Sequence, residues 1–177
     1  MQKGILIGGT GGQGIIAAGE FLSEALFRAD YEVINSRSYG SEARGGSCRS
    51  EVVVSDLEIY DLTVEEADIL VILSTPAFNR YQDIAKPGAL VVVDAAVLSK
   101  LGDAEIRSDV ELVPVPAREI AEGLGNAIVA NMVLLGALAK RSELIPLAKL
   151  KDAVEAMMRP SMREVNLRAL DAGHEKA

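Results

Sequence analysis

Cysteine, histidine and tryptophan are almost absent from this sequence of 177 residues. It contains one cysteine, Cys48, one histidine, His174, and no tryptophan. A single thiol excludes a disulfide framework and an iron–sulfur site with four cysteine ligands inside the chain. A catalytic thiol would need a neighbouring base, and His174 lies in a polar stretch near the C-terminus. We therefore predict that Cys48 is a half-buried strand residue.

Aromatic residues and long apolar runs are also scarce. Aromatic residues make up 4% of the chain and apolar residues 49%, so the core must consist mainly of Ala, Val, Ile and Leu, as in parallel α/β sheets. The longest apolar stretch, 128–139, is interrupted by Asn131 and is far shorter than the ~20 residues that cross a bilayer. No basic segment followed by a long apolar one opens the sequence. We expect a cytoplasmic protein with no membrane partner.

Positive charge is in the minority, and several catalytic patterns are missing. The 18 basic and 26 acidic residues give a net charge of −8 and a pI near 4.8, which argues against a nucleic-acid partner. The sequence lacks the H-x-x-x-H, G-x-S-x-G and G-K-[ST] patterns, so it predicts no metal, serine-hydrolase or P-loop chemistry. We expect no catalytic residue and no metal ligand on this chain.

Short apolar runs alternate with helical periodicities along the chain, which predicts a three-layer α/β fold with a mostly parallel, Rossmann-like sheet. We predict one domain, 1–177, with a frayed tail at 173–177. After a first strand that ends in a glycine-rich stretch, the expected strands are 32–37, 48–55, 69–73, 89–94 and 111–115, with a short return strand at 57–60 and a turn at 86–88. The expected helices are 15–28, 75–84, 117–122, 126–141, 146–158 and 162–172.

The stretch from Lys3 to Gly14 organises the chain. A short apolar strand leads into Gly9, Gly11 and Gly14 on G-x-G-x-x-G spacing, and a helical pattern follows. A strand, a glycine turn and a helix in this order aim backbone N–H groups and the positive end of the helix dipole at one point, which suits a phosphate or another anion. The same glycines would also serve tight strand–helix packing, and both interpretations remain open.

A dinucleotide site of the Rossmann type needs a further residue that this sequence does not supply. Such a site has a carboxylate at the end of the second strand to bind the ribose. Here that strand ends in Asn35, Ser36 and Arg37. Arg37 would suit a 2′-phosphate, but the missing carboxylate weakens the hypothesis of a free-standing nucleotide-binding oxidoreductase.

Two further polar features stand out downstream. The loop Glu42-Ala43-Arg44-Gly45-Gly46 places an arginine beside two glycines. Arg44 there either clamps a phosphate or carboxylate or is a solvated turn residue. Asn131 interrupts the most apolar helix, and it either ties the helix to a neighbouring loop, which we favour, or faces a ligand.

Taken together, these motifs resemble those of a known family. The paired Gly-Gly-Gln-Gly and Glu-x-Arg-Gly-Gly motifs, with Ala130-Asn131-Met132 far downstream, resemble the gamma subunit of 2-oxoacid:ferredoxin oxidoreductases, nearest to the 2-oxoglutarate (KorC-like) type. The pair is much more specific than either motif alone, and the resemblance spans nearly the whole chain. The residues that it marks as cofactor-binding are Gly9, Thr10, Gly11, Gly12, Gln13, Gly14, Glu42, Arg44, Gly45 and Gly46.

The resemblance implies a function as part of a complex. In such enzymes a 2-oxoacid is oxidatively decarboxylated on thiamine diphosphate, coenzyme A takes the acyl group, and electrons pass through iron–sulfur clusters to ferredoxin. The gamma part packs over the active site and is associated with coenzyme A. The resemblance therefore implies alpha, beta and ferredoxin-like delta subunits as partners, with thiamine diphosphate, Mg²⁺ and the clusters on those subunits. It also implies a chain that is inactive alone, and the motifs are shared with pyruvate, ketoisovalerate and indolepyruvate enzymes.

Overall fold

A computed structural model describes residues 1–39, 46–101 and 106–177. Its centre is a six-stranded sheet in the order β2-β3-β1-β4-β5-β6. The strands are β1 (Gln2–Thr10), β2 (Glu32–Tyr39), β3 (Ser47–Ser55), β4 (Ala67–Ile72), β5 (Ala85–Asp94) and β6 (Glu111–Val115). The helices are α1 (Ile15–Phe27), α2 (Thr75–Tyr81), α3 (Ala95–Leu98), α4 (Ala117–Gly123), α5 (Ala130–Ser142), α6 (Leu147–Met157) and α7 (Pro160–Lys176), with single 3₁₀ turns η1 (Gln82–Ile84) and η2 (Ala127–Val129).

The apolar runs of the sequence form the middle of this sheet. Strand β1 pairs in parallel with β4, which pairs in parallel with β5, and β5 pairs in parallel with β6. Ile5, Leu6 and Ile7 at the centre of β1 are completely buried. Strands covered on both faces need such continuous apolar runs, because each face must pack against a helix layer. The predicted mostly parallel sheet is confirmed.

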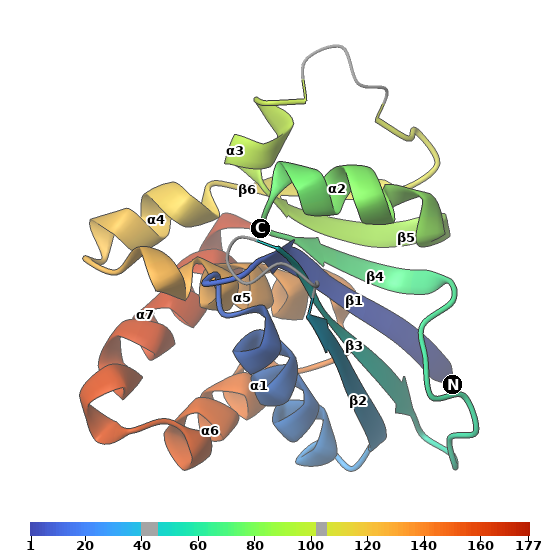
Figure 1. Ribbon diagram of the computed structural model, residues 1–177. Helices are drawn as coiled ribbons and strands as arrows, with labels where there is room; N and C mark the ends of the chain where they lie inside the picture. The colour runs from blue at the N-terminus through green and yellow to red at the C-terminus, as the bar shows by residue number, and fades with distance from the viewer. Residues whose placement is uncertain (40–45, 102–105) are drawn as a thin grey trace.

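Helices cover both faces of the sheet and complete three layers (Figure 1). On one face, α1, α5, α6 and α7 enclose the larger core, which includes Leu22 and Leu135. On the other face, α2 and α3 enclose a smaller core around Phe78 and Val97. The three-layer α/β architecture that the alternation of elements predicts is therefore present, and in the described residues no helix has the length and apolarity to cross a membrane.

The first β–α–β unit differs from the simplest expectation. Strand β3 lies between β1 and β2 and runs antiparallel to both. The pair β1 and β2 is consequently parallel, as a β–α–β unit requires, but separated by one strand. Two local predictions are wrong as well. Residues 57–60 form no strand, and residues 86–88 belong to β5, where Gly88 takes a left-handed conformation (φ 78°) instead of forming a turn.

The predicted frayed tail at 173–177 is wrong, because α7 continues to Lys176. The reason is a close contact with α5. A Cβ atom on Gly173 would lie 1.8 Å from the carbonyl oxygen of Val133, and one on Gly136 would lie 2.1 Å from that of Leu170. These two glycines bring the helix backbones together, so the last turns of α7 are held by packing that a reading of local polarity does not reveal.

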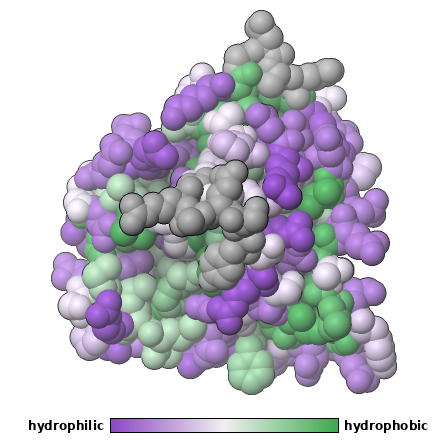
Figure 2. Space-filling view, viewed as in Figure 1, coloured by the Kyte–Doolittle hydropathy of each residue, from purple (hydrophilic) through white to green (hydrophobic). Residues whose placement is uncertain are grey.

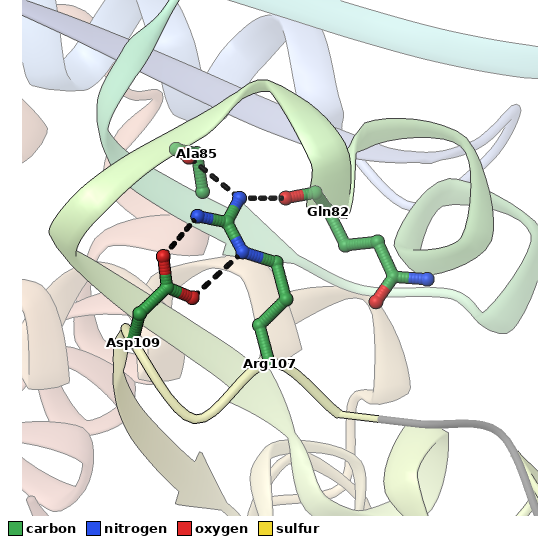
Figure 3. A network of polar contacts seen from close by, with 4 residues as sticks. All are labelled: Gln82, Ala85, Arg107 and Asp109. Carbon is green, nitrogen blue, oxygen red and sulfur yellow. Dashed lines mark hydrogen bonds and ion pairs between the residues drawn. The ribbon is translucent and has the colours of Figure 1, made fainter.

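A polar clamp fixes the segment that enters β6 (Figure 3). The guanidinium of Arg107 donates to the carboxylate of Asp109 at 2.7 and 2.9 Å, and to the carbonyl oxygens of Gln82 and Ala85 at 3.1 and 2.6 Å. The backbone N–H of Gly88 donates to the carbonyl of Asp109. These contacts hold the segment around Asp109 against the start of β5.

Candidate functional site

The glycine loop connects the carboxyl end of β1 to α1. The backbone N–H of Gln13 donates to the carbonyl of Thr10 at 3.2 Å and closes the turn. Gly14 follows in the left-handed conformation (φ 69°, ψ 29°) as the residue preceding α1. A Cβ atom there would lie 2.5 Å from Nδ2 of Asn131. Both the backbone angle and the close neighbour therefore require glycine at this position.

The first turn of α1 offers uncapped backbone N–H groups. Among the described residues, no side chain caps this helix, and its first turn carries no carboxylate. A helix of 13 residues presents a partial positive charge at such an end. Gly12 is exposed beside it, and no atom of the described chain lies within 4 Å of its Cβ position. As far as the described residues reach, the loop therefore presents an uncovered surface that attracts anions.

Gln13 holds the loop in place through both ends of its side-chain amide. Its Oε1 accepts a hydrogen bond from the backbone N–H of Thr10 at 2.8 Å, and its Nε2 donates to the carbonyl of Leu73 at 3.0 Å. The N–H of Leu73 in turn donates to the carbonyl of Gly8. Gln13 thus ties the glycine loop to the end of β4. Its direct contact with a ligand stays a prediction.

Asn131 ties the loop to the second helix layer. Its Nδ2 donates to the carbonyl of Gly14 at 3.0 Å, and its Oδ1 accepts from the N–H of Met132 at 2.7 Å. The side chain is buried. The expected tether between helix and loop is confirmed, and it accounts for a polar residue in the most apolar helix because both ends of the amide are satisfied.

The second sequence motif begins beside the first, as far as the structure describes it. Glu42, Arg44 and Gly45 lie outside the described residues, so their predicted roles stay predictions. Gly46 is described, and its carbonyl oxygen accepts a hydrogen bond from the N–H of Gly11 at 3.1 Å. The next residue, Ser47, pairs with Thr10 in the sheet. Two motifs more than thirty residues apart therefore meet at one edge of the sheet.

A cleft adjoins the glycine loop at the carboxyl ends of β4, β5 and β6. It consists of two hollows of about 270 and 310 Å³ that share Gln13, Leu73, Asp94 and Arg118. Ile128 lines the first hollow and is 57% exposed. A position beyond the carboxyl ends of parallel strands is the usual ligand site of open α/β sheets.

Two cations in this cleft were not singled out from the sequence. Arg118 lies in the first turn of α4, and Lys100 follows α3. Neither forms an ion pair with any residue in the described ranges. Asp94 and Glu122 line the same cleft, and Asp94 is buried with its Oδ1 accepting from the N–H of Ala96. The signal that could have found them is positional, since each cation follows shortly after a strand that ends at this edge.

Two other candidates from the sequence lie away from a chemical role. Arg37 forms an ion pair with Glu20 at 2.7 Å, so it is already engaged by a carboxylate. Cys48 is buried in β3, more completely than predicted, and burial raises the pKa of its thiol. A raised pKa disfavours the thiolate form and hence a nucleophilic role. Among the described residues, no three His, Cys, Asp or Glu side chains gather as metal ligands would.

Comparison with known proteins places this architecture. The family described as pyruvate ferredoxin/flavodoxin oxidoreductase matches residues 4–176. The chain belongs to this family, as a gamma-type subunit. It is 40% identical over 179 residues to the 2-oxoglutarate synthase subunit KorC of Methanocaldococcus jannaschii, and the match covers 100% of this chain and 95% of that one.

Two solved structures share the whole fold. The gamma subunit of a keto/oxoacid ferredoxin oxidoreductase from Geobacter sulfurreducens superposes with a TM-score of 0.86 at 30% identity, covering 99% of this chain and 96% of that chain. The 2-oxoglutarate:ferredoxin oxidoreductase from Magnetococcus marinus, with 2-oxoglutarate, coenzyme A and succinyl-CoA bound, superposes with a TM-score of 0.84 at 28% identity. This chain covers 31% of that longer chain. In that relative, a domain of this fold forms part of a larger polypeptide.

Proposed function

We propose that this gamma subunit acts in a complex that oxidatively decarboxylates 2-oxoglutarate, transfers the succinyl group to coenzyme A and passes the electrons to ferredoxin. The choice of 2-oxoglutarate is supported by the identity to KorC over the full chain. It is also supported by the likeness to an enzyme solved with 2-oxoglutarate and succinyl-CoA.

The role that we assign to this chain is to help close the active site and to bind coenzyme A. The observation that carries it is the hydrogen bond between Gly11 and Gly46, which brings the two motifs together at the open first turn of α1. Coenzyme A carries a diphosphate and a further phosphate. Backbone N–H groups at a helix start and arginine side chains are the groups that bind such anions. The cleft with Arg118 and Lys100 extends this surface.

The redox cofactors belong, in this proposal, to alpha, beta and delta partner subunits. One buried cysteine cannot supply the four thiolates of an iron–sulfur cluster. The described residues likewise offer no cluster of carboxylates or histidines for the Mg²⁺ that accompanies thiamine diphosphate. The chain alone is therefore expected to have no oxidoreductase activity.

The test is the coenzyme A dependence of the assembled complex with Arg118→Ala in this chain. A charged hydrogen bond contributes about 1.5–3 kcal/mol, so we expect the KM for coenzyme A to rise about ten- to a hundredfold. The KM for 2-oxoglutarate should stay unchanged. Arg168→Ala is the matched control, because Arg168 is exposed on α7, away from the cleft. An unchanged KM in Arg118→Ala and in Arg44→Ala, with normal assembly, would contradict the assigned binding role.

The alternatives are a free-standing Rossmann-type nucleotide-binding oxidoreductase and a pure interaction domain. The first is disfavoured because β3 separates β2 from β1. The carboxyl end of the second strand, which holds the ribose in Rossmann domains, is thereby moved one strand away from the glycine loop. The hypothesis of a free-standing nucleotide-binding oxidoreductase predicts NAD(P) binding by the isolated chain, which calorimetry can detect. The second predicts that coenzyme A leaves the melting temperature of the chain and of its complex unchanged.

A further inference from the structure

The amino ends of the central strands, opposite the glycine loop, carry a segment of unusual composition. Residues 56–66, here called the acidic segment, connect β3 to β4 and contain five carboxylates and no lysine or arginine. Asp68, two residues after the segment, pairs with Lys86 at 2.9 Å, and Asp56 within the segment pairs with the N-terminal amino group of Met1. The other four carboxylates of the segment, Glu58, Asp61, Glu65 and Glu66, form no ion pair with the described residues, so the surface of the segment is negative.

The acidic segment has no helix or strand, yet the core and hydrogen bonds hold it in one conformation. The backbone N–H of Val64 donates to Oε2 of the buried Glu51 at 3.0 Å. Oδ2 of Asp61 accepts from Gln2 in β1 at 2.9 Å. Ile59 packs against the smaller core, and Val64 is part of it. The segment is therefore anchored at several points, so a partner that bound it would not bear the full entropy cost of ordering a free loop.

This fixed segment turns large apolar side chains to the outside. Leu57 is 71% exposed, Tyr60 80% and Leu62 63%. They account for three of the eight large apolar side chains that are exposed in the described part of the chain. Figure 1 draws the connection from β3 to β4 at the lower right. In the same view, Figure 2 shows hydrophobic surface toward the lower right, next to hydrophilic surface. A hollow of about 450 Å³ lies beside them, lined in part by Tyr60 and Leu62.

We propose that the acidic segment is a docking surface for another subunit of the complex, which presents an apolar pocket surrounded by lysines and arginines. Three exposed apolar side chains that alternate along the segment with carboxylates supply both components of a usual interface, an apolar centre and a charged rim. A gamma-type subunit must contact other subunits. A second copy of this chain does not fit, because two such segments would place ten carboxylates against one another.

The location supports this assignment. The segment lies at the amino ends of β1 and β4, whereas the glycine loop lies at their carboxyl ends (Figure 1). A subunit bound at the acidic segment would leave the glycine loop and the cleft accessible. The proposal rests on membership in a family of complex-forming subunits and not on coenzyme A binding, so either can fail without the other.

The first arm of the test removes the apolar anchors. The chain carrying Leu57→Ser, Tyr60→Ser and Leu62→Ser is co-expressed with its partner subunits, and the affinity between the purified subunits is measured. We expect at least a tenfold loss of affinity. The control Phe27→Ser removes a side chain that is 68% exposed elsewhere and should leave assembly unchanged. Melting temperatures of the isolated variants check that both fold.

The second arm reverses the charge. Glu58→Lys, Glu65→Lys and Glu66→Lys together should weaken assembly at low salt by at least tenfold and remove most of its dependence on ionic strength. Asp152→Lys, Glu155→Lys and Glu164→Lys reverse three exposed carboxylates on α6 and α7 and are the matched control.

Three outcomes would overturn the proposal. One is unchanged assembly in the serine triple. Another is an equal loss of assembly in both charge-reversed triples. The third is a dimer of the isolated chain that the serine triple dissociates, which would assign the surface to a second copy. In complexes that still assemble, the KM for coenzyme A should equal the wild-type value, which separates this test from that of the glycine loop.

Discussion

The two ends of the central strands carry opposite chemistry. At the carboxyl ends, the glycine loop, the open start of α1, Arg118 and Lys100 form a surface suited to anions. At the amino ends, the acidic segment and Asp68 form a negative surface with exposed apolar side chains. A chain with a net charge of −8 can thus still present an anion-attracting surface, and six of its 26 acidic residues, those within 56–68, lie at the other end of the same strands. Overall charge describes the average surface and not the site.

Substituting Gly14 should destabilise the structure at the carboxyl ends of the central strands and leave the structure at their amino ends intact. Gly14→Val places a branched side chain at φ 69° and against Asn131, and should lower the free energy of unfolding by about 2–4 kcal/mol. Hydrogen exchange should show lost protection at the start of α1 and unchanged protection around Val64. Gly123→Ala is the control, since no atom of the described chain lies within 4 Å of its Cβ position. Equal stability of Gly14→Val and wild type would contradict the role given to Gly14.

A smaller effect is expected from removing the tether at Asn131. Asn131→Ala leaves the carbonyl of Gly14 and the N–H of Met132 without this partner, which should cost about 1–3 kcal/mol in urea unfolding. In the assembled complex the KM for coenzyme A should also rise, because the loop loses its fixed position. The control is Asn79→Ala, at an exposed position of α2. A normal KM despite lost stability would show that the tether serves only the fold.

The smallest expected effect is on the pH dependence of stability, through Asp109 at the amino end of β6. The guanidinium of Arg107 lowers the pKa of Asp109 below its ordinary value of 3.8. A carboxyl group with a lowered folded pKa stabilises the protein above its unfolded pKa, and that stability is lost as pH falls through the folded value. Between pH 6 and pH 3 the melting temperature of wild type should therefore fall slightly more than that of Asp109→Asn. Parallel curves would show that the clamp in Figure 3 contributes nothing measurable through this charge.

The sequence predicted those features that depend on local order. A strand, a glycine turn and a helix follow one another directly, so the turn between β1 and α1 could be predicted, whereas the left-handed conformation of Gly14 came from the structure. The long apolar runs fixed the buried strands in the same way. Asn131 was predicted as a tether because a lone amide in an apolar helix needs a partner, although the sequence did not name Gly14 as that partner.

The features that the sequence did not reveal depend on contacts between distant segments. The insertion of β3 between β1 and β2 is a pairing choice that no single strand pattern encodes. The order of 173–177 comes from the close approach of Gly136 and Gly173 across two helices. Lys86-Pro87-Gly88 has the composition of a turn, yet the three residues lie within β5. There the backbone N–H of Gly88 donates to the carbonyl of Asp109. Arg118 and Lys100 line the same cleft as Gln13 because the sheet brings the ends of different strands together.

The position of β3 also determines when the site can form during synthesis. Strands β1 and β2 each pair with β3 and not with one another, so the pairing of either strand on this side is incomplete until β3 has been synthesised. The glycine loop is held by hydrogen bonds to three residues that are synthesised after it, Gly46, Leu73 and Asn131. A nascent chain that stops before Asn131 therefore contains the complete glycine motif without the bond from Asn131 to Gly14, so the loop is fully held only after α5 has been synthesised.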